Sequence, residues 1–444
     1  MKRILLLLSF LAGLHGIVRA QESQFALDLH REAQELRTDC SEGWQKLLFV
    51  CAEDVFTEQP LHLAVGSLAP QDGFGVGPAL VVAHDTANWR LSLDSDAVVS
   101  TNASWRAGVY LQALFTKEKG ITVVTDPKKV SARRSLVHEY PVVNAYAQAI
   151  SLNAIDFYGI GPTTQRSQEA IFGMRETIAG LNVLYPLIPR LHVSLFGELN
   201  GRFVDIRAGG VSGVASQPGF LQAGEGIRLQ ESWFGDRLQP DLTLTYQQFE
   251  APGSKYSFQR LSTNAGVNVP LARSISEKTT TYHGPDDCGT AMQGHRCPAV
   301  VDRNGSVGVR LFVTQSIIPA GNSVPFYFQP TIGGGDLNGQ TLLPAYGDYR
   351  FRAPNMIVAR ANCEHSLYGP LGFQFLYDIG KVADTSSALG FSHLAHSFGA
   401  GLTLRVGGIP QVSFLFGFGG GEGTHALLLM NNSSTGGSGR PSLY

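Results

Sequence analysis

The sequence predicts an all-β protein: a closed antiparallel transmembrane β-barrel of sixteen strands, preceded by a short helical segment. The first observation is that many segments alternate between apolar and polar residues, which places the two kinds of side chain on opposite faces of a strand. The second is composition: 16% of the 444 residues are charged and 43% are hydrophobic. After Ala20, no apolar run is long enough to cross a membrane as a helix. Strands with one apolar face, in a chain of low charge, suit a barrel that turns this face to lipid and encloses a polar lumen.

Residues 1–20 have the layout of a secretory signal peptide. Lys2 and Arg3 precede the apolar run Ile4–Leu14, and Ala20 ends a small-residue cleavage site. This order of a charged, an apolar and a small-residue region is read by the export machinery. We therefore expect residues 1–20 to be removed and the remaining chain to be exported.

Residues 21–60 contain two amphipathic stretches with helical spacing, Ser23–Arg37 and Trp44–Val50. They predict a short helical segment in the periplasm, for which a periplasmic protein is a candidate partner. Outer-membrane lipid is the expected partner of the apolar strand faces. The 34 basic and 36 acidic residues nearly cancel, so no nucleic-acid partner is expected.

The barrel is expected over residues 61–430, followed by a polar Gly/Ser-rich tail, residues 431–444, that we expect to be flexible. The expected strands are Leu61–Leu68, Val76–His84, Trp89–Thr101, Ser104–Thr116, Val142–Asn153, Ala170–Leu184, Arg190–Val204, Pro240–Glu250, Tyr256–Val269, Gly305–Gln315, Val324–Thr331, Tyr349–Glu364, Leu371–Val382, Ser397–Val406, Gln411–Phe418 and Thr424–Met430.

Connection lengths test this assignment independently. Outer-membrane barrels have short turns at the periplasmic end and longer loops outside. With the first strand entering from the periplasm, the outer links Asp205–Gln239, Pro270–Asn304 and Ile332–Asp348 are long, whereas most inner links are short. The exception is Lys117–Pro141, a long inner link rich in Lys and Arg. A barrel of this width needs more than strand side chains to fill it, so we expect Ile332–Asp348 to plug the lumen.

Five cysteines occur in a chain that is expected to reach an oxidising compartment. Cys288 and Cys297 lie close together in one loop and are expected to pair, and Cys40 and Cys51 form a second possible pair. Cys363 falls on the outward face of its strand, where it serves as a small apolar residue. No Cys-x-x-Cys spacing occurs, so we expect neither a metal site nor a cofactor.

A further signal is concentrated between Gly333 and Val382. This stretch contains, in order, Gly333-Gly334, Leu343-Pro344-Ala345-Tyr346, Tyr349-Arg350-Phe351-Arg352, Glu364 and Leu376-Tyr377-Asp378-Ile379-Gly380-Lys381-Val382.

These motifs resemble the C-terminal barrel of the bacterial surface antigen family, the BamA/TamA-like outer-membrane assembly and secretion barrels. In that family a Gly-Gly segment precedes a Leu-Arg-Gly-Tyr/Phe loop, which lies between the eleventh and twelfth strands and docks inside the barrel. Here Pro344 and Ala345 replace the loop arginine and glycine. Residues 21–60 leave no room for the family's periplasmic POTRA domains. The resemblance is thus to a barrel-only member that assembles, inserts or translocates protein or lipid.

Six charged residues are predicted on the inward faces of three consecutive strands. They have two possible roles. One is to solvate and brace the lumen. The other is to let Glu364 and Asp378 hold the loop inside the barrel, with a strand arginine in place of the missing loop arginine. Arg350 and Arg352 are the two arginines considered for that replacement. The full set comprises Arg350, Arg352, Arg360, Glu364, Asp378 and Arg405.

Two other functions stay open at this point: a passive pore or structural surface antigen, and a barrel-embedded lipid hydrolase. A hydrolase would need a Ser and His pair, for which His192 with Ser194 and His396 with Ser397 are the nearest candidates. No Gly-x-Ser-x-Gly, His-Glu-x-x-His or phosphate-binding loop is present. We therefore do not expect an enzyme.

Overall fold

The computed structural model describes residues 61–115, 141–275, 301–430 and 440–443, except for residues 87, 189–190, 208, 210, 212–217, 232, 235–236, 369–370 and 407–408. The predicted signal peptide, the helical segment 21–60 and the cysteines Cys40, Cys51, Cys288 and Cys297 all lie outside the described residues.

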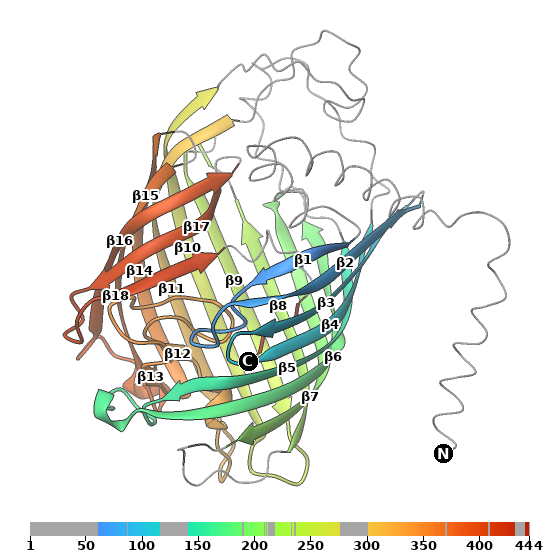
Figure 1. Ribbon diagram of the computed structural model, residues 1–444, viewed down its shortest axis with the longest axis vertical. Coiled ribbons are helices and arrows are strands. Elements are labelled where there is room, and N and C mark those ends of the chain that lie inside the picture. The colour runs from blue at the N-terminus through green and yellow to red at the C-terminus, as the bar shows by residue number, and fades with distance from the viewer. Residues whose placement is uncertain are drawn as a thin grey trace, which may run out of the picture.

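The described chain forms one antiparallel sheet of sixteen strands in which almost every strand pairs with its neighbours in the chain. Figure 1 shows this sheet curling around an axis, with β1 and β18 both on the side that faces the viewer. In the part of the chain that the structure describes, no helix is long and apolar enough to cross a membrane. The sheet strands are β1 Leu61–Gly66, β2 Gly75–Asp85, β3 Trp89–Ser100, β4 Trp105–Phe115, β5 Val142–Phe157, β6 Ala170–Ile188, β7 Val193–Arg207, β8 Gly219–Gln230, β9 Gln239–Glu250, β10 Phe258–Ile275, β11 Val301–Ile317, β14 Asn355–Tyr368, β15 Leu371–Ala383, β16 Ala395–Val406, β17 Ile409–Phe418 and β18 His425–Met430.

The prediction of a closed barrel is wrong in one respect, because the sheet is not closed by strand pairing. The strand order begins at β1 and ends at β18, and within the described residues no ladder joins these two strands. Each has six residues, whereas the other strands of the sheet have ten to nineteen. A short strand offers few backbone groups to a ladder, so closure at this seam gains little from hydrogen bonding.

The two faces of the sheet differ as the alternation predicts. Inward-facing Asp96, Glu176 and Arg202 are buried, whereas outward-facing Leu199 and Phe203 are exposed. Many other apolar side chains share the outward face and are 37% or more exposed, including Leu93, Val109, Leu111, Leu221, Ile227, Leu244, Val307, Val309, Leu311, Phe375, Leu402, Phe414 and Phe416. An apolar exterior is what hydrocarbon around a barrel requires. The interior combines these charged residues with a buried apolar cluster that includes Phe172, Phe249 and Phe258.

Strand β8 was assigned to a loop by the sequence prediction Asp205–Gln239. Its sequence GFLQAGEGIRLQ is rich in glycine, which weakens the strand signal. The alternation is nevertheless present, since Phe220 and Gln222 are buried while Leu221 and Ile227 are exposed.

The expected strand Val324–Thr331 is also wrong. Two prolines, Pro325 and Pro330, remove backbone donors from this segment. Residues Phe326–Phe328 instead form a 3₁₀ turn whose aromatic rings pack on inward rings of β8, β9 and β10. The predicted total of sixteen strands is correct because these two errors compensate.

The corrected strand order moves the link between β10 and β11 to the other end of the barrel. Residues 276–300 connect β10 to the start of β11, and the motif loop leaves from the end of β11. The two links therefore lie at opposite ends, whereas Pro270–Asn304 and Ile332–Asp348 were predicted at the same end. The motif loop retains its predicted place between the eleventh and twelfth strands of the sheet, which are β11 and β14.

Candidate functional site

The site with the densest set of specific contacts is the loop that joins β11 to β14, which we call the motif loop (residues 318–354). Its central residues are buried almost without interruption from Thr331 to Leu337 and again from Thr341 to Tyr346. Within it, β12 (Thr331–Ile332) pairs with β13 (Phe351–Arg352) to form a separate two-stranded sheet. The loop therefore folds back into the barrel as a plug, as expected for its Ile332–Asp348 part.

The turn that starts the motif requires glycine. Gly334 has a φ of 58°, and a Cβ at this position would overlap the Asp348 side chain. The same Asp348 Oδ1 accepts a 2.7 Å hydrogen bond from the Gly335 N–H. Gly333 and Gly334 therefore let the loop turn tightly over the half-buried carboxylate of Asp348.

The tip of the loop is held by side chains of β15 and β16. The Leu343 N–H donates to Asp378 Oδ2 at 2.8 Å, and the Ala345 N–H donates to Ser397 Oγ at 2.7 Å. Both acceptor residues are fully buried. Pro344 lies between them and has no N–H of its own, so the tip presents its two available donors to the barrel wall.

Close packing accompanies these hydrogen bonds. A Cβ on Gly417 of β17 would overlap the carbonyl of Pro344, and one on Gly420 would press on the ring of Tyr346. Leu343 itself adopts a φ of 54°, which is uncommon for a non-glycine residue. Small residues on the wall and an unusual backbone conformation in the loop together fix how deeply the tip sits.

Asp378 also pairs with a strand arginine. Arg360 on β14 donates from Nε to Asp378 Oδ1 at 2.7 Å and from Nη2 to Oδ2 at 2.6 Å, and its Nη2 also donates to the carbonyl of Thr341. A two-pronged guanidinium–carboxylate contact of this kind is among the stronger hydrogen-bonded pairs in proteins. Arg360 and Asp378 therefore connect two barrel strands to the N-terminal side of the loop tip, at Thr341 and Leu343.

The partners of Arg350 are not Glu364 and Asp378, with which the sequence predicted it to act. Its Nε bonds to Glu422 Oε1 at 2.6 Å, in the link between β17 and β18. Its two other nitrogens bond to Thr164 Oγ1 and to the Thr164 carbonyl at 2.8 and 2.7 Å, in the link between β5 and β6. Arg350 thus clamps the return of the motif loop to two other links at the same end of the barrel.

Arg352 is buried among aromatic rings. Its Nη1 donates to the Phe326 carbonyl at 2.7 Å, and its guanidinium lies 6.0 Å from the ring centroids of Phe157, Phe172 and Phe326. The prediction that Arg350 and Arg352 face the lumen from a barrel strand is therefore wrong. Both belong to the plug, because Pro354 separates them from β14, which begins at Asn355.

The remaining predicted residues lie apart from this cluster. Glu364 faces Ser306 and Gln374 across the ladder, nearer to the 369–370 turn than Arg360 is. Arg405 belongs to β16, and its side chain lies outside the described residues. Of the six charged residues, the structure brings together Arg360 and Asp378.

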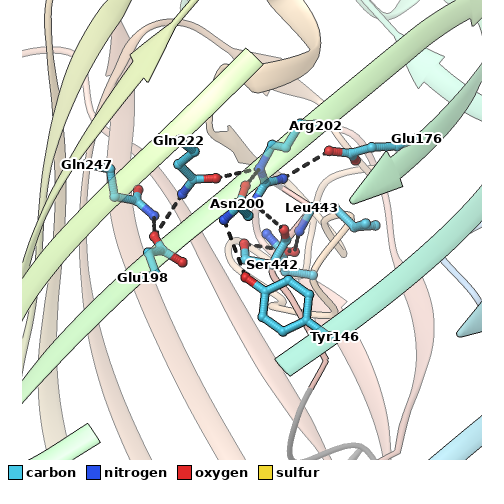
Figure 2. Close-up of polar contacts among 10 residues, drawn as sticks. Tyr146, Glu176, Glu198, Asn200, Arg202, Gln222, Gln247, Ser442 and Leu443 are labelled. Carbon is cyan, nitrogen blue, oxygen red and sulfur yellow. Dashed lines mark hydrogen bonds and ion pairs between the residues drawn. The ribbon is translucent and has the colours of Figure 1, made fainter. Parts of the chain in front are cut away.

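A second polar cluster on β5 to β9 was missed by the sequence analysis and is drawn in Figure 2. Arg202 Nη1 lies 2.9 Å from Glu176 Oε1, and both side chains are essentially inaccessible. Arg202 Nε also donates to Asn200 and Gln222. Gln222 and Gln247 in turn donate to Glu198 Oε1 at 2.8 and 2.7 Å.

The sequence signal for this cluster was the alternation itself, in which polar residues at inward positions follow exposed apolar residues. Arg202 lies between Gly201 and the outward Phe203. The sequence pattern places each of these polar residues on the lumen face, but it gives no information on which of them meet.

Residues 440–443 also lie in the lumen, against the inward faces of β3, β4 and β7. Arg440 Nη2 is 2.7 Å from Asp96 Oδ2, and the Ser442 carbonyl accepts from Arg202 Nη2 at 2.8 Å (Figure 2). Leu443 is buried. Residues 440–443 therefore make specific contacts within the tail 431–444 that was expected to be flexible, whereas residues 431–439 and 444 lie outside the described residues.

Two carboxylates outside the strands, the buried Asp72 and the half-buried Asp348, hold the links at the motif-loop end. Asp72, between β1 and β2, accepts from Ser104 Oγ and from the Asn153 N–H. Burial raises the pKa of Asp72 and also that of Asp348. The folded protein therefore holds these protons more tightly than the unfolded chain does. Their contribution to stability declines as the pH rises from the ordinary aspartate range toward the raised pKa.

The Ser and His pairs considered for a hydrolase are not assembled for catalysis. Ser397 Oγ is occupied by the Ala345 N–H. Ser194 Oγ is buried without a hydrogen-bond partner, and His192 Nδ1 lies 3.7 Å from Glu231. In the described residues no hydrogen bond joins His192 to Ser194, so a base next to the hydroxyl is missing. The described site fills the lumen, and its side chains Asp378 and Ser397 bind backbone N–H groups of the motif loop.

A scan against protein-family models and a search of curated proteins found no match. Similar solved structures exist. BamA from Haemophilus ducreyi lacking POTRA domains 1–3 superposes with a TM-score of 0.49 and 12% identity, over 83% of this chain and 68% of that chain.

Two CdiB structures are similar as well. CdiB from Escherichia coli gives a TM-score of 0.46 and 11% identity, and CdiB from Acinetobacter baumannii gives 0.43 and 10%. The matches cover 84% of this chain but 61% and 56% of the CdiB chains. These are likenesses at low identity, and the description of the fold rests on the strand order and register given above.

Proposed function

We propose that the chain is an outer-membrane barrel of the bacterial surface antigen family that assembles, inserts or translocates protein or lipid at that membrane. The observation that carries the proposal is the motif loop. It leaves from the eleventh strand, enters the lumen and docks its tip on Asp378 of β15, within the Leu376–Val382 motif. A loop fixed in this way against the wall serves transport or assembly better than it serves a permanently open channel.

The seam between β1 and β18 supports the same proposal. Within the described residues, each of these strands has one partner strand in the sheet. A sheet edge offers backbone donors and acceptors to an incoming strand, and this is the mode by which an extended polypeptide is added to a sheet. Strands β16 and β17, next to this seam, expose apolar side chains such as Leu402 and Phe414, which would keep such a segment next to lipid.

The proposal is tested by depleting the chain from a bacterium that produces it. We expect the chain to fractionate with the outer membrane and to migrate differently before and after heating. We also expect the amount of correctly folded outer-membrane proteins to fall severalfold on depletion. Wild type and the G197A variant should restore it, because a Cβ at Gly197 meets open space. The D378A variant should not.

The same preparation tests the pore alternative. In planar bilayers, a plugged barrel should give low and intermittent conductance. A large, steady conductance from the wild-type protein, together with unchanged outer-membrane proteins on depletion, would contradict the proposal and favour a passive pore.

A further inference from the structure

Residues 440–443 contact the lumen wall through a charged anchor and an apolar anchor. The Arg440 guanidinium meets Asp96 Oδ2 at 2.7 Å and lies 5.9 Å from the centroid of the Tyr110 ring. Three residues later, Leu443 is 5% exposed and belongs to the apolar cluster that includes Tyr146. The two anchors fix the direction and register of the segment.

The backbone between the anchors is recognised as well. Arg202 Nη2 donates to the Ser442 carbonyl at 2.8 Å, and the Leu443 N–H donates to Asn338 Oδ1 of the motif loop at 2.7 Å. Pro441 has a restricted φ, so less conformational entropy is lost when the segment is held. Paired main-chain hydrogen bonds with side-chain anchors on either side are what a peptide-binding site provides.

The two buried charges of this site have ionic partners on the wall itself. Asp96 already pairs with Arg106, whose Nη2 lies 2.7 Å from Asp96 Oδ2. Arg202 already has Glu176 as its ionic partner. Withdrawal of residues 440–443 therefore leaves neither buried charge without a counter-charge, and the segment can exchange with another ligand at low cost.

We propose that the inward faces of β3, β4 and β7, together with Asn338, form a peptide-binding site that residues 440–443 fill from within the same chain. The ligand class is an extended polypeptide segment with a basic residue followed, three positions later, by an aliphatic residue. The competing ligand would be a client polypeptide, and in this respect the inference rests on the proposed function. Residues 440–443 then act as a resident ligand that keeps the site closed until a client displaces them.

The test is direct binding in detergent solution, followed by fluorescence anisotropy. The probe is a labelled peptide of residues 438–444 with both ends blocked. The receptor is the full chain or the R440G/P441S/S442G/L443S variant, in which the resident ligand is lost. The variant should bind the peptide at least about tenfold more tightly than the full chain, where residues 440–443 compete, a difference of about 1.4 kcal/mol. Added salt should weaken binding, because the Arg440 anchor is ionic.

Controls separate recognition from damage to the barrel. A peptide with R440E should bind the same receptor at least about tenfold more weakly, and this control changes no protein residue. The N338A receptor variant should weaken binding while its heat-modifiable migration stays normal. Equal binding of the two peptides, or no binding to the variant receptor, would overturn the inference. Neither result depends on the depletion assay, so the two proposals can fail separately.

Discussion

The lumen holds two inserted segments, and they are held differently. The motif loop is seated on β15 to β17 by two backbone hydrogen bonds to fully buried residues and by contacts that leave no room for a Cβ on Gly417. Residues 440–443 are seated on β3, β4 and β7 by one ion pair, one backbone hydrogen bond and one buried leucine, and a second backbone hydrogen bond joins them to Asn338 of the motif loop.

The difference lies in what the wall would lose. If the motif loop left, Asp378 would keep Arg360 but lose the Leu343 N–H, and the small residues of β16 and β17 would face a void. If residues 440–443 left, Asp96 and Arg202 would keep their counter-charges. Close packing therefore makes the motif loop a permanent part of the barrel. Residues 440–443 can be exchanged, because the charges that they contact keep their partners without them. Substitutions can test this contrast.

The largest effect is expected for R202M, which leaves Glu176 buried without its counter-charge. Removing one partner of a buried pair costs about 3–5 kcal/mol of unfolding free energy. Unfolding in urea of protein refolded in lipid vesicles, followed by tryptophan fluorescence, measures this. The double variant E176Q/R202M should recover at least half of the loss, and the motif loop should remain resistant to protease in both. A loss below about 1 kcal/mol would show that the pair is solvated.

D378A is expected to cost about 3 kcal/mol, because Arg360, 17% exposed at its side chain, can partly reach water. Unlike R202M, this variant should also release the loop tip, since Leu343 loses its acceptor. Limited proteolysis of vesicle-bound protein should then cut within residues 337–347. An uncut loop in D378A would mean that packing alone holds the tip, which would weaken the role assigned to this carboxylate.

G417A tests packing without a change of charge. The added methyl group would overlap the Pro344 carbonyl, so we expect a loss of about 1–3 kcal/mol and faster proteolysis of the loop. G197A is the matched control on β7, where the Cβ has open space and the effect should be within about 0.5 kcal/mol. If both variants behave alike, the loop can shift to accept the methyl group.

The smallest effect is expected for D241N. Asp241 pairs with Arg310 at 2.6 Å, but both side chains are more than a fifth exposed in the lumen. A partly solvated pair contributes no more than about 1 kcal/mol. The urea midpoint should therefore barely move, and the loop and the segment 440–443 should stay in place. A large loss here would show that the lumen is drier than the exposure of this pair indicates.

Much of the candidate site was predictable from local patterns. The alternation placed Arg360 and Asp378 on inward faces of adjacent strands, where the ladder puts them directly opposite each other. The loop also lies between the eleventh and twelfth strands, as expected, although the segment predicted as the eleventh strand, Val324–Thr331, belongs to the loop itself. These features depend on neighbours in sequence or on strand geometry with a period of two.

The partners of Arg350 were not predictable in this way. Its contacts, Thr164 and Glu422, come from links far away in the sequence that meet at one end of the barrel. The strand assignment also failed at β8, whose glycines weaken the strand signal, and at Val324–Thr331, whose internal prolines oppose a strand that its apolar residues suggested.

By itself, the sequence determined that the chain makes strands with an apolar outer face and a polar inner face. The side-chain direction in a strand follows from backbone geometry alone. Only the tertiary structure decided which inner residues meet, where the motif loop rests, and that Arg440 reaches Asp96 across 344 positions of sequence. Those contacts depend on strand order, register and the path of the loops through the lumen, which no local pattern contains.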